Sequence, residues 1–389
     1  MDIEPRKLLQ AARAGQNGLL QRLEALVRTE SPSENKAAVD QASHLVAAWM
    51  SELGGRVRWH KQRNVGDLLE VRFAAQTRQK GLRPVMLLGH LDTVWPMGTL
   101  AQMPFRIQGG KALGPGVYDM KAGAVMAVEA LRILLEAGAL ATPVVVLLNS
   151  EEEIGSPCSR AVTEKLAQEC SAVFVLEPAQ GPQGAYKTAR KGVGQFQLRV
   201  QGVAAHSGVD FDKGHSAIVE LAGLIAQVDR FTDLKRGLTV NPGVIAGGTR
   251  SNVVAAGALA EVDVRIARSQ DAARVERLFR GLRVRDKGCQ LQVTGGINRP
   301  PMERTKGTAR LFLRAQALAR GMGLDLEGAS SGGGSDGNFT AALGVPTLDG
   351  MGAVGEGAHA EHESIVLRHL PVRTALLAAM VAGHAQNNM

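Results

Sequence analysis

The chain has 389 residues, of which 45% are hydrophobic and 21% are charged, a composition typical of a globular protein with room for two domains. The formal net charge is +8, but lysines and arginines are scattered instead of clustered, which argues against a nucleic-acid-binding protein. No apolar run is long enough to span a membrane, the first residues lack a signal-peptide pattern, and the three cysteines form no CxxC pair; these features predict a cytoplasmic protein.

Helix and strand patterns alternate in the first part of the chain. Apolar residues at intervals of three to four predict helices over 18–28, 37–53 and 123–135. Alternating or continuous apolar residues predict strands over 67–73, 85–88, 144–148 and 173–176. This order predicts an α/β fold, with a mixed or parallel sheet covered on both faces.

Three of the expected strands run directly into possible metal ligands. The first is followed by His90 and Asp92, the second by the acidic run 151–153, and the third by Glu177. For a lone histidine at a strand end, an ordinary surface residue is the better interpretation. Three such strands in succession favour a functional site, because ligands collect at the carboxyl edge of α/β sheets.

The pattern changes near Gly192. Alternating segments predict strands over 194–202, 238–248, 258–267 and 289–295, and apolar spacing predicts helices over 215–231 and 271–282. We therefore expect a compact α+β insert over 193–298, within a first domain made of 1–192 and 299–389. From Lys306 to the end, the pattern predicts helices and loops.

Three further segments carry candidate chemistry. Asp119 follows a glycine-bracketed loop at a helix start, where it could cap the helix or reach a metal. The run 151–153 is usually a solvated turn, but after a buried strand it could supply one metal ligand and one general base. The glycine-rich run 330–337 lacks the Lys-Ser/Thr ending of a phosphate-binding loop, so its backbone N–H groups could instead approach a substrate carboxylate or carbonyl. After it come His359 and His362, between which spacing does not choose.

Seven motifs occur in order between about residues 85 and 362: HLDTV, GPGVYDMKAG, EEEIGS, LEP, AAHSG, GGGSDG and GAHAE. Together they resemble the di-zinc aminoacylase and carboxypeptidase family, and are most similar to the bacterial glutamate carboxypeptidases within it. The resemblance implies a two-domain metallohydrolase whose inserted domain is a dimerisation lid. Each motif alone is weak, whereas the ordered set is specific.

The resemblance also implies a set of metal ligands. His90, Asp119 and Glu177 would bind one zinc ion, and Asp119, Glu153 and His359 would bind the other, with Asp119 bridging the two. Imidazole and carboxylate ligands suit zinc, for which cobalt or manganese can substitute.

Further roles follow from the same motifs. Glu152 would be the general base, and Asp92 would orient the His90 ring. His206 would reach across a homodimer to stabilise the oxyanion in the partner's site. The expected binders of the substrate carboxylate are Asn252, Arg265 and Arg299. For His206 and the arginines, an ordinary surface position is the alternative.

The predicted function is zinc-dependent hydrolysis of the amide bond of N-acyl amino acids or small peptides, with glutamate as the expected leaving group. Glutamate-selective relatives carry an additional lysine before the insert, and neither Lys187 nor Lys191 lies in register with it. The alternatives are a deacylase of acetylated or succinylated biosynthetic intermediates and, more remotely, a metal-binding scaffold without activity. Glu177 disfavours carbamoyl or ureido substrates, because relatives that act on them have histidine there.

Overall fold

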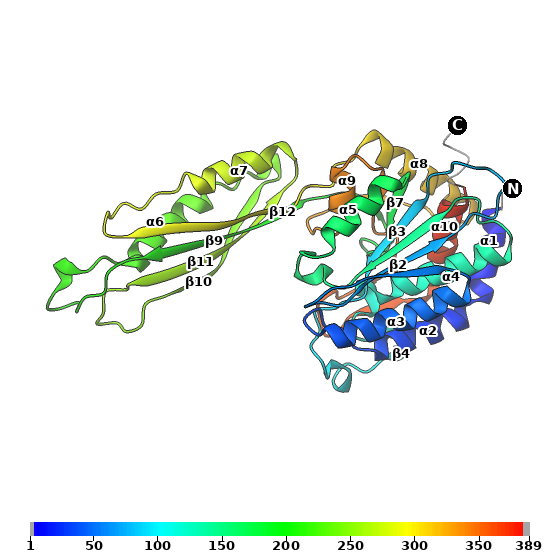
Figure 1. Ribbon diagram of the computed structural model, residues 1–389, viewed down its shortest axis with the longest axis horizontal. Coiled ribbons are helices and arrows are strands. Elements are labelled where there is room, and N and C mark those ends of the chain that lie inside the picture. The colour runs from blue at the N-terminus through cyan, green and yellow to red at the C-terminus, as the bar shows by residue number, and fades with distance from the viewer. Residues whose placement is uncertain (1–3, 384–389) are drawn as a thin grey trace. The chain divides into compact units, whose positions relative to one another are not determined.

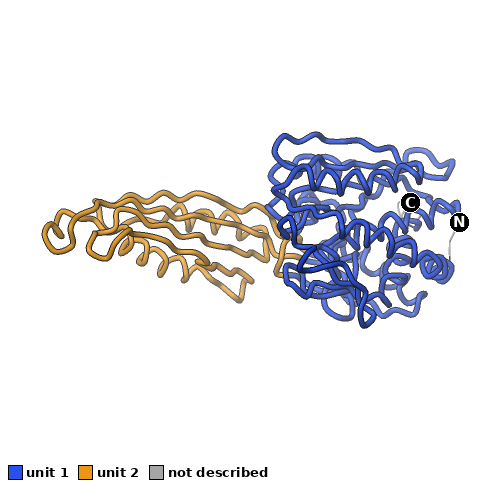
Figure 2. The backbone as a smooth tube through the Cα atoms, turned by 90° about the horizontal axis from the view of Figure 1, so that it is seen from below, with its two compact units in different colours: residues 1–189, 304–331, 335–389 blue, residues 190–303, 332–334 orange. Residues whose placement is uncertain are grey.

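The computed structural model describes residues 4–383, which form two compact units (Figure 2). Within the described residues, unit 1 comprises 4–189, 304–331 and 335–383, and unit 2 comprises 190–303 with 332–334. The expected insert, 193–298, lies inside unit 2. The segment 332–334 joins unit 2 because Arg190 Nη1 donates to the carbonyls of Gly333 and Gly334, a contact that local sequence patterns do not reveal.

Unit 1 is built on a six-stranded sheet with strand order β1-β2-β6-β3-β7-β14. β1 and β2 are antiparallel to their neighbours, and β6, β3, β7 and β14 run parallel to one another. The strands are β1 (Arg56–His60), β2 (Leu68–Phe73), β3 (Val85–His90), β6 (Val144–Asn149), β7 (Ala172–Val175) and β14 (Thr347–Leu348). The predicted α/β class is confirmed.

Helices cover both faces of this sheet (Figure 1). Val144, Val146 and Leu148 of β6 face one apolar cluster, whereas Val145 and Leu147 face the other. Each of these side chains is almost completely buried, which contributes about 1.5–3 kcal/mol apiece, so a one-residue slip of β6 would be costly. The first cluster includes residues of α1 (Pro5–Ala14), α2 (Gln16–Arg28), α3 (Lys36–Glu52), α4 (Ala122–Glu136), α8 (Lys306–Gly321) and α10 (Leu370–Ala382). The second includes α5 (Arg160–Glu169), against which α9 (Gly337–Ala342) packs.

Smaller sheets complete unit 1. β4 (Arg106–Gln108), β5 (Lys111–Leu113), β16 (Ser364–Val366) and β15 (Gly355–Glu356) form one, and β8 (Tyr186–Arg190) pairs with β13 (Gly328–Ser331) in another. The prediction of only helices and loops after Lys306 is therefore wrong. The strands missed there have two to four residues, too few for an alternation of apolar and polar residues to be recognised.

Unit 2 is a four-stranded antiparallel sheet with order β10-β11-β9-β12, covered on one face by two helices (Figure 1). Phe196, Leu198 and Val200 alternate along β9 and pack against the helices. The elements are β9 (Gly192–Gln201), α6 (Ala217–Asp229), β10 (Thr239–Gly247), β11 (Gly257–Ile266), α7 (Gln270–Arg280) and β12 (Gln290–Arg299). Within residues 4–383, no helix is long and apolar enough to cross a membrane.

A buried arginine in α10 holds the loops that follow β7 and β14. The Arg373 side chain is 1% exposed, lies over the Tyr186 ring, and donates hydrogen bonds to the carbonyls of Gly184, Gly350 and Gly352. Gly352 in turn donates its N–H to the Glu177 carbonyl, 2.9 Å away. The guanidinium therefore satisfies backbone acceptors that no sheet ladder reaches.

We expect Arg373→Met to destabilise unit 1 by about 3 kcal/mol, because three buried carbonyls lose their donor. Chemical denaturation followed by tryptophan fluorescence measures this directly, since all three tryptophans (Trp49, Trp59 and Trp95) belong to unit 1. The exposed Arg368 supplies the control, Arg368→Met, which should change stability by no more than about 0.5 kcal/mol. Equal stability of the two variants would contradict the role given to Arg373.

Candidate metal centre

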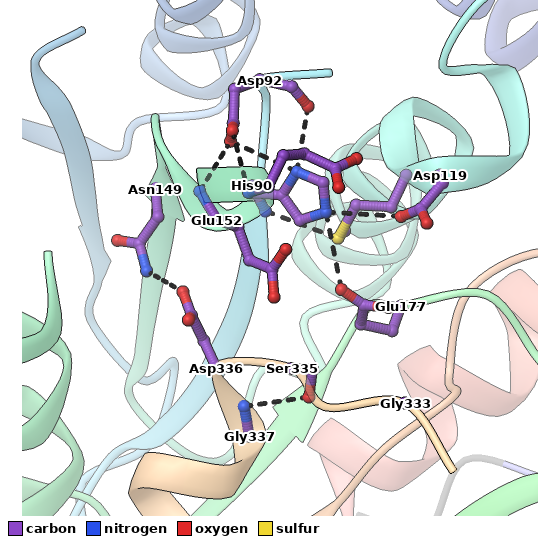
Figure 3. Close-up of polar contacts among 12 residues, drawn as sticks. His90, Asp92, Asp119, Asn149, Glu152, Glu177, Gly333, Ser335, Asp336 and Gly337 are labelled. Atoms are coloured by element: carbon purple, nitrogen blue, oxygen red, sulfur yellow. Dashed lines mark hydrogen bonds and ion pairs between the residues drawn. The ribbon is translucent and has the colours of Figure 1, made fainter. Parts of the chain in front are cut away.

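The parallel strands bring their carboxyl ends to one edge of the sheet of unit 1. β3 ends at His90, which pairs in register with Asn149 at the end of β6. Leu88 of β3 pairs with Val175 of β7, and Glu177 follows two residues later. The expectation that these strands share one edge is confirmed, and Figure 3 shows His90, Glu152 and Glu177 converging there.

Asp119 reaches this edge from a loop. The loop turns at Gly116, whose φ of +71° is left-handed and whose missing Cβ would lie 2.6 Å from the Thr93 side chain. The Asp119–Met120 peptide bond is cis. α4 begins only at Ala122 and has no side-chain cap, so the interpretation of Asp119 as a helix cap is wrong.

The carboxylate of Asp119 lies between two histidines. Its Oδ1 is 3.4 Å from His90 Nε2, which is also 3.5 Å from Glu177 Oε1 (Figure 3). Its Oδ2 is 3.6 Å from His359 Nε2, which is 3.2 Å from Glu153 Oε2. The structure therefore forms two groups of one histidine and two carboxylates, which share Asp119.

The first of the three adjacent glutamates has different partners from the other two. Glu151 is buried and accepts hydrogen bonds from the N–H groups of Ser159, at 2.7 Å, and Cys158, at 3.3 Å, just before α5. Glu152 lies in the short 3₁₀ turn Glu152–Ile154, and its carboxylate comes within 4.8 Å of ligand atoms of His90 and Glu177. The sequence alone did not reveal that Glu151 satisfies backbone donors at a helix start.

Asp92 connects His90 to the turn that carries the other two glutamates. His90 Nδ1 is 3.0 Å from the Asp92 carbonyl oxygen and 3.3 Å from Oδ1. The Asp92 carboxylate also accepts the N–H groups of Glu152 and Glu153, each at 3.1 Å, and the Ser33 hydroxyl at 2.6 Å. Asp92 is thus placed to orient the imidazole and to fix the acidic turn at the same time.

The two candidate histidines of the last motif differ in position. Both are exposed, but His359 contacts the carboxylates of Asp119 and Glu153 described above. His359 has a φ of 62°, in the left-handed region that residues other than glycine seldom adopt. Its contacts therefore favour His359 over His362, a choice that spacing had left open.

Charge and burial act against each other at this edge. Burial lowers the pKa of His90, but Asp119, Asp92 and Glu177 hold it well above its ordinary value. Hydrogen bonds with Asp119 and Glu153 raise the pKa of His359 to about 10, and burial raises the pKa of Glu153. Within residues 4–383, His90 Nε2, Asp119 Oδ1 and Glu153 Oε1 are buried without a hydrogen bond. Buried polar atoms of this kind suit a bound cation, and these three residues form one candidate metal-binding group, while His90 forms a second with Glu152 and Glu177.

The glycine-rich segment 330–337 is hydrogen-bonded to residues at this edge of the sheet. Asp336 accepts a hydrogen bond from Asn149 Nδ2, at 2.6 Å (Figure 3). It also accepts one from the Ser156 hydroxyl, and so links β6 to the segment that follows the acidic turn. The N–H groups of residues 335, 337 and 338 donate within the segment itself. Those three N–H groups are therefore not available to a substrate, contrary to the expectation from the sequence. The role of Asp336 was missed because its hydrogen-bond partners are distant in sequence.

The four residues expected to contact substrate lie in unit 2, in two groups. His206 and Asn252 are exposed and adjacent, since the bridge between His206 and Val253 joins their segments and Ser207 N–H donates to the Asn252 carbonyl. Arg265 and Arg299 both pair with Val193, from opposite sides of β9. Val193 is the second residue of β9 and His206 follows the other end of this ten-residue strand, so about 30 Å separates the groups within one chain.

Comparison with known proteins identifies the family. The model of the peptidase family M20/M25/M40 matches residues 86–383. Carboxypeptidase G2 from Pseudomonas sp. (strain RS-16) is 28% identical over 382 residues, which is 96% of this chain and 91% of that protein. Acetylornithine deacetylase from Klebsiella pneumoniae (strain 342) is 28% identical over 273 residues, 62% of this chain and 66% of that protein.

The crystal structure of aminopeptidase PepT from Bacillus cereus has the same fold, with a TM-score of 0.77 at 22% identity, covering 94% of this chain and 98% of that one. The family and the hydrolase class predicted from the motifs are thereby confirmed. The chain belongs to the peptidase family M20/M25/M40.

Proposed function

We propose that this protein hydrolyses the amide bond of N-acyl amino acids or small peptides at a centre of two zinc ions, with glutamate as the leading candidate for the released amino acid. The observation that carries this proposal is the position of Asp119, whose two carboxylate oxygens each face a different histidine and carboxylate pair. A bridging carboxylate between two such groups is the ligand arrangement expected of a two-metal hydrolase.

The residues present fit this centre. We assign His90, Asp119 and Glu177 to one zinc ion, and Asp119, Glu153 and His359 to the other. Three of these residues have buried polar atoms that accept or donate no hydrogen bond within residues 4–383, which supports a cation as their partner. Nitrogen and oxygen ligands favour zinc, and cobalt or manganese can substitute.

Bound zinc supplies Lewis acidity, which polarises the substrate carbonyl and acidifies the attacking water. We assign to Glu152 the transfer of a proton from this water to the leaving amine, since its carboxylate lies within 4.8 Å of ligand atoms of His90 and Glu177 and the assignment above gives it no zinc ion. Asp92 holds the Glu152 N–H at 3.1 Å and so fixes the backbone from which the base projects. Glu152 therefore has both the reach and the support that a general base needs.

Arg265 and Arg299 are the proposed binders of the substrate carboxylate. They flank Val193 at one level of the sheet of unit 2 and point to the same face, because residues paired in register share a face. Asp263 holds the Arg265 guanidinium through Nε and Nη2, at 2.9 Å each, which leaves other N–H groups to donate. Neither nearby lysine is assigned to the family's additional lysine: Lys187 is buried on β8, and Lys191 lies between β8 and β9.

A deacylase of the same family is the second candidate. The relative from Klebsiella is named for deacetylation of acetylornithine, and its reaction also releases an amine from an amide. The metal centre and the general base would serve both reactions equally, so the difference lies in the acyl group and the amino acid that unit 2 accepts. A scaffold without activity is disfavoured, because every proposed ligand and the proposed base are present.

We propose that the protein is a homodimer through unit 2. β10 is an edge strand, and exposed apolar side chains lie along it and the neighbouring start of α6: Ile218, Val219, Val244 and Ile245. An apolar edge of this kind favours pairing with a second copy. The separation of His206 and Asn252 from Arg265 and Arg299 is also consistent with the first two serving the site of the partner subunit.

A reducing, cytoplasmic location fits the three cysteines. Cys158, Cys170 and Cys289 are all free thiols in the structure, and two of them are buried. Burial raises the pKa of Cys170 to about 12, so this thiol is unreactive and suits a core position better than a redox role.

The first prediction concerns substrate and metal. Release of amino acids from N-acyl glutamates, folate-like glutamates, acetyl-amino acids and dipeptides should require zinc, stop with chelator, and be fastest for glutamate conjugates. If ornithine or another amino acid is released fastest, amide hydrolysis is supported but glutamate is wrong as the leaving group. No release from any compound by a zinc-loaded protein would favour the scaffold.

The second prediction separates base from ligand. Glu152→Ala should keep both zinc ions and lose a factor of about 10² to 10⁴ or more in kcat, because the proton acceptor is removed but no ligand is. Zinc content by atomic emission and turnover on the best substrate measure both quantities. Glu153→Ala is the contrasting variant, since it should lose zinc as well as turnover. A Glu152→Ala protein with substantial turnover at full zinc content would refute the assignment.

The third prediction tests the dimer. A mixture of equal amounts of inactive Glu152→Ala and inactive His206→Ala chains, after subunit exchange, should regain about a quarter of the parent activity, since half of the dimers are mixed and each has one complete site. Activity is measured before and after exchange, with the mass confirmed by light scattering. If His206 acts within its own chain, the mixture stays inactive.

A further inference from the structure

Glu363 is a buried carboxylate to which the preceding assignments give no role. Its side chain is 1% exposed. Oε1 accepts hydrogen bonds from the N–H groups of Tyr118, at 2.9 Å, and Asp119, at 3.0 Å. Oε2 accepts the Gly116 N–H and the Trp95 indole Nε1–H, each at 2.8 Å. Four neutral donors therefore surround one carboxylate.

These donors belong to two segments that carry proposed metal ligands. Gly116, Tyr118 and Asp119 form the turn that presents the bridging carboxylate, and Trp95 follows the segment with His90 and Asp92. Glu363 itself lies four residues after His359, in a turn closed by hydrogen bonds from Ala360 N–H to the Gly357 carbonyl and from Glu363 N–H to the Ala360 carbonyl. Glu363 thus joins three segments that are up to 268 residues apart.

A buried carboxylate of this kind could simply stabilise the fold. Three features indicate that Glu363 also positions residues of the proposed metal centre. One of its partners is the backbone N–H of Asp119 itself, so the position of Glu363 sets where the bridging residue leaves the backbone. The turn from His359 to Glu363 is short, so the same contact sets the distance between Asp119 and His359, whose side chains are 3.6 Å apart. The Asp119 loop has no sheet neighbour that could fix it instead, since residues 114–121 belong to no strand.

We propose that Glu363 is a positioning residue for the metal centre, which holds the bridging Asp119 and the ligand His359 at the separation that two cations require. The proposal rests on the assignment of these two residues as metal ligands. Its effect is indirect: Glu363 contacts the backbone of one ligand and carries the other on its own turn.

Glu363→Gln tests the proposal with almost no change in volume. A carboxamide has one acceptor oxygen, and its NH₂ group would face two N–H donors wherever it points. In the metal-free protein, amide hydrogen exchange of peptides covering 114–121 should become faster. Titration against a competing chelator should show zinc and cobalt binding weakened by about 10–100-fold, as for other residues that orient ligands. The visible absorption of the cobalt form should change with it.

Glu220→Gln is the matched control. Glu220 is also a buried glutamate and accepts the N–H groups of Arg285, at 2.7 Å, and Asp286, at 3.2 Å, but it lies in unit 2. This variant should lower the melting temperature and leave cobalt absorption and metal affinity unchanged. A Glu363→Gln protein that is only less stable, with the parent's metal affinity and cobalt spectrum, would overturn the proposal.

Two further outcomes are informative. If Glu363→Gln does not fold, Trp95→Phe decides, because it removes one of the four donors and keeps the carboxylate. Its metal affinity should fall in the same direction by a smaller factor, and an unchanged affinity and spectrum would overturn the proposal. If the parent protein itself binds neither zinc nor cobalt, the proposed function fails and this inference with it, a result distinct from normal binding by both parent and variant.

Discussion

The concentration of negative charge at the carboxyl edge of the sheet is the constraint on which the rest of unit 1 depends. Five carboxylates and two histidines meet there: Asp92, Asp119, Glu152, Glu153, Glu177, His90 and His359. Even with both imidazoles protonated, three negative charges stay unbalanced in a partly buried site. Two divalent cations with neutral imidazoles would leave only one unbalanced negative charge. Gathering these carboxylates costs free energy when no cation is bound, and bound cations would offset that cost.

Much of this site could be predicted from the sequence, because β3, β6 and β7 are continuous apolar runs that stop at polar residues, and parallel strands share an edge. What the sequence could not supply were contacts between distant segments. The local sequence does not distinguish Glu151, which accepts backbone N–H groups at the start of a helix, from Glu152 and Glu153. It also does not distinguish Glu363 from Glu361, two residues earlier. The strands β13 to β16 were missed for a related reason: they are too short to have a pattern and form only where a neighbour offers a ladder.

The proposed metal ligands differ in how their backbones are held. His90 ends a strand, and its backbone is fixed by the neighbouring β6. Asp119 and Glu153 are on turns, each held by a buried polar side chain, whereas His359 lies in the loop between the paired strands β15 and β16. Glu363 accepts the Asp119 N–H, and Asp92 accepts the Glu153 N–H. A loop ligand needs such a partner because its backbone donors are buried without a strand to receive them. Buried residues such as Glu363 and Asp92 therefore help to fix the backbone of the proposed site.

The proposed site residues are divided between the two units. The proposed metal ligands and the proposed base all lie in unit 1, at strand ends and in turns held by hydrogen bonds. The proposed contacts to the substrate carboxylate and oxyanion lie in unit 2, at positions about 30 Å apart along β9. One chain cannot bring both ends of a strand to one small molecule. In the homodimer proposed above, the two groups would belong to two different sites. The length of β9 is therefore itself an argument for the dimer.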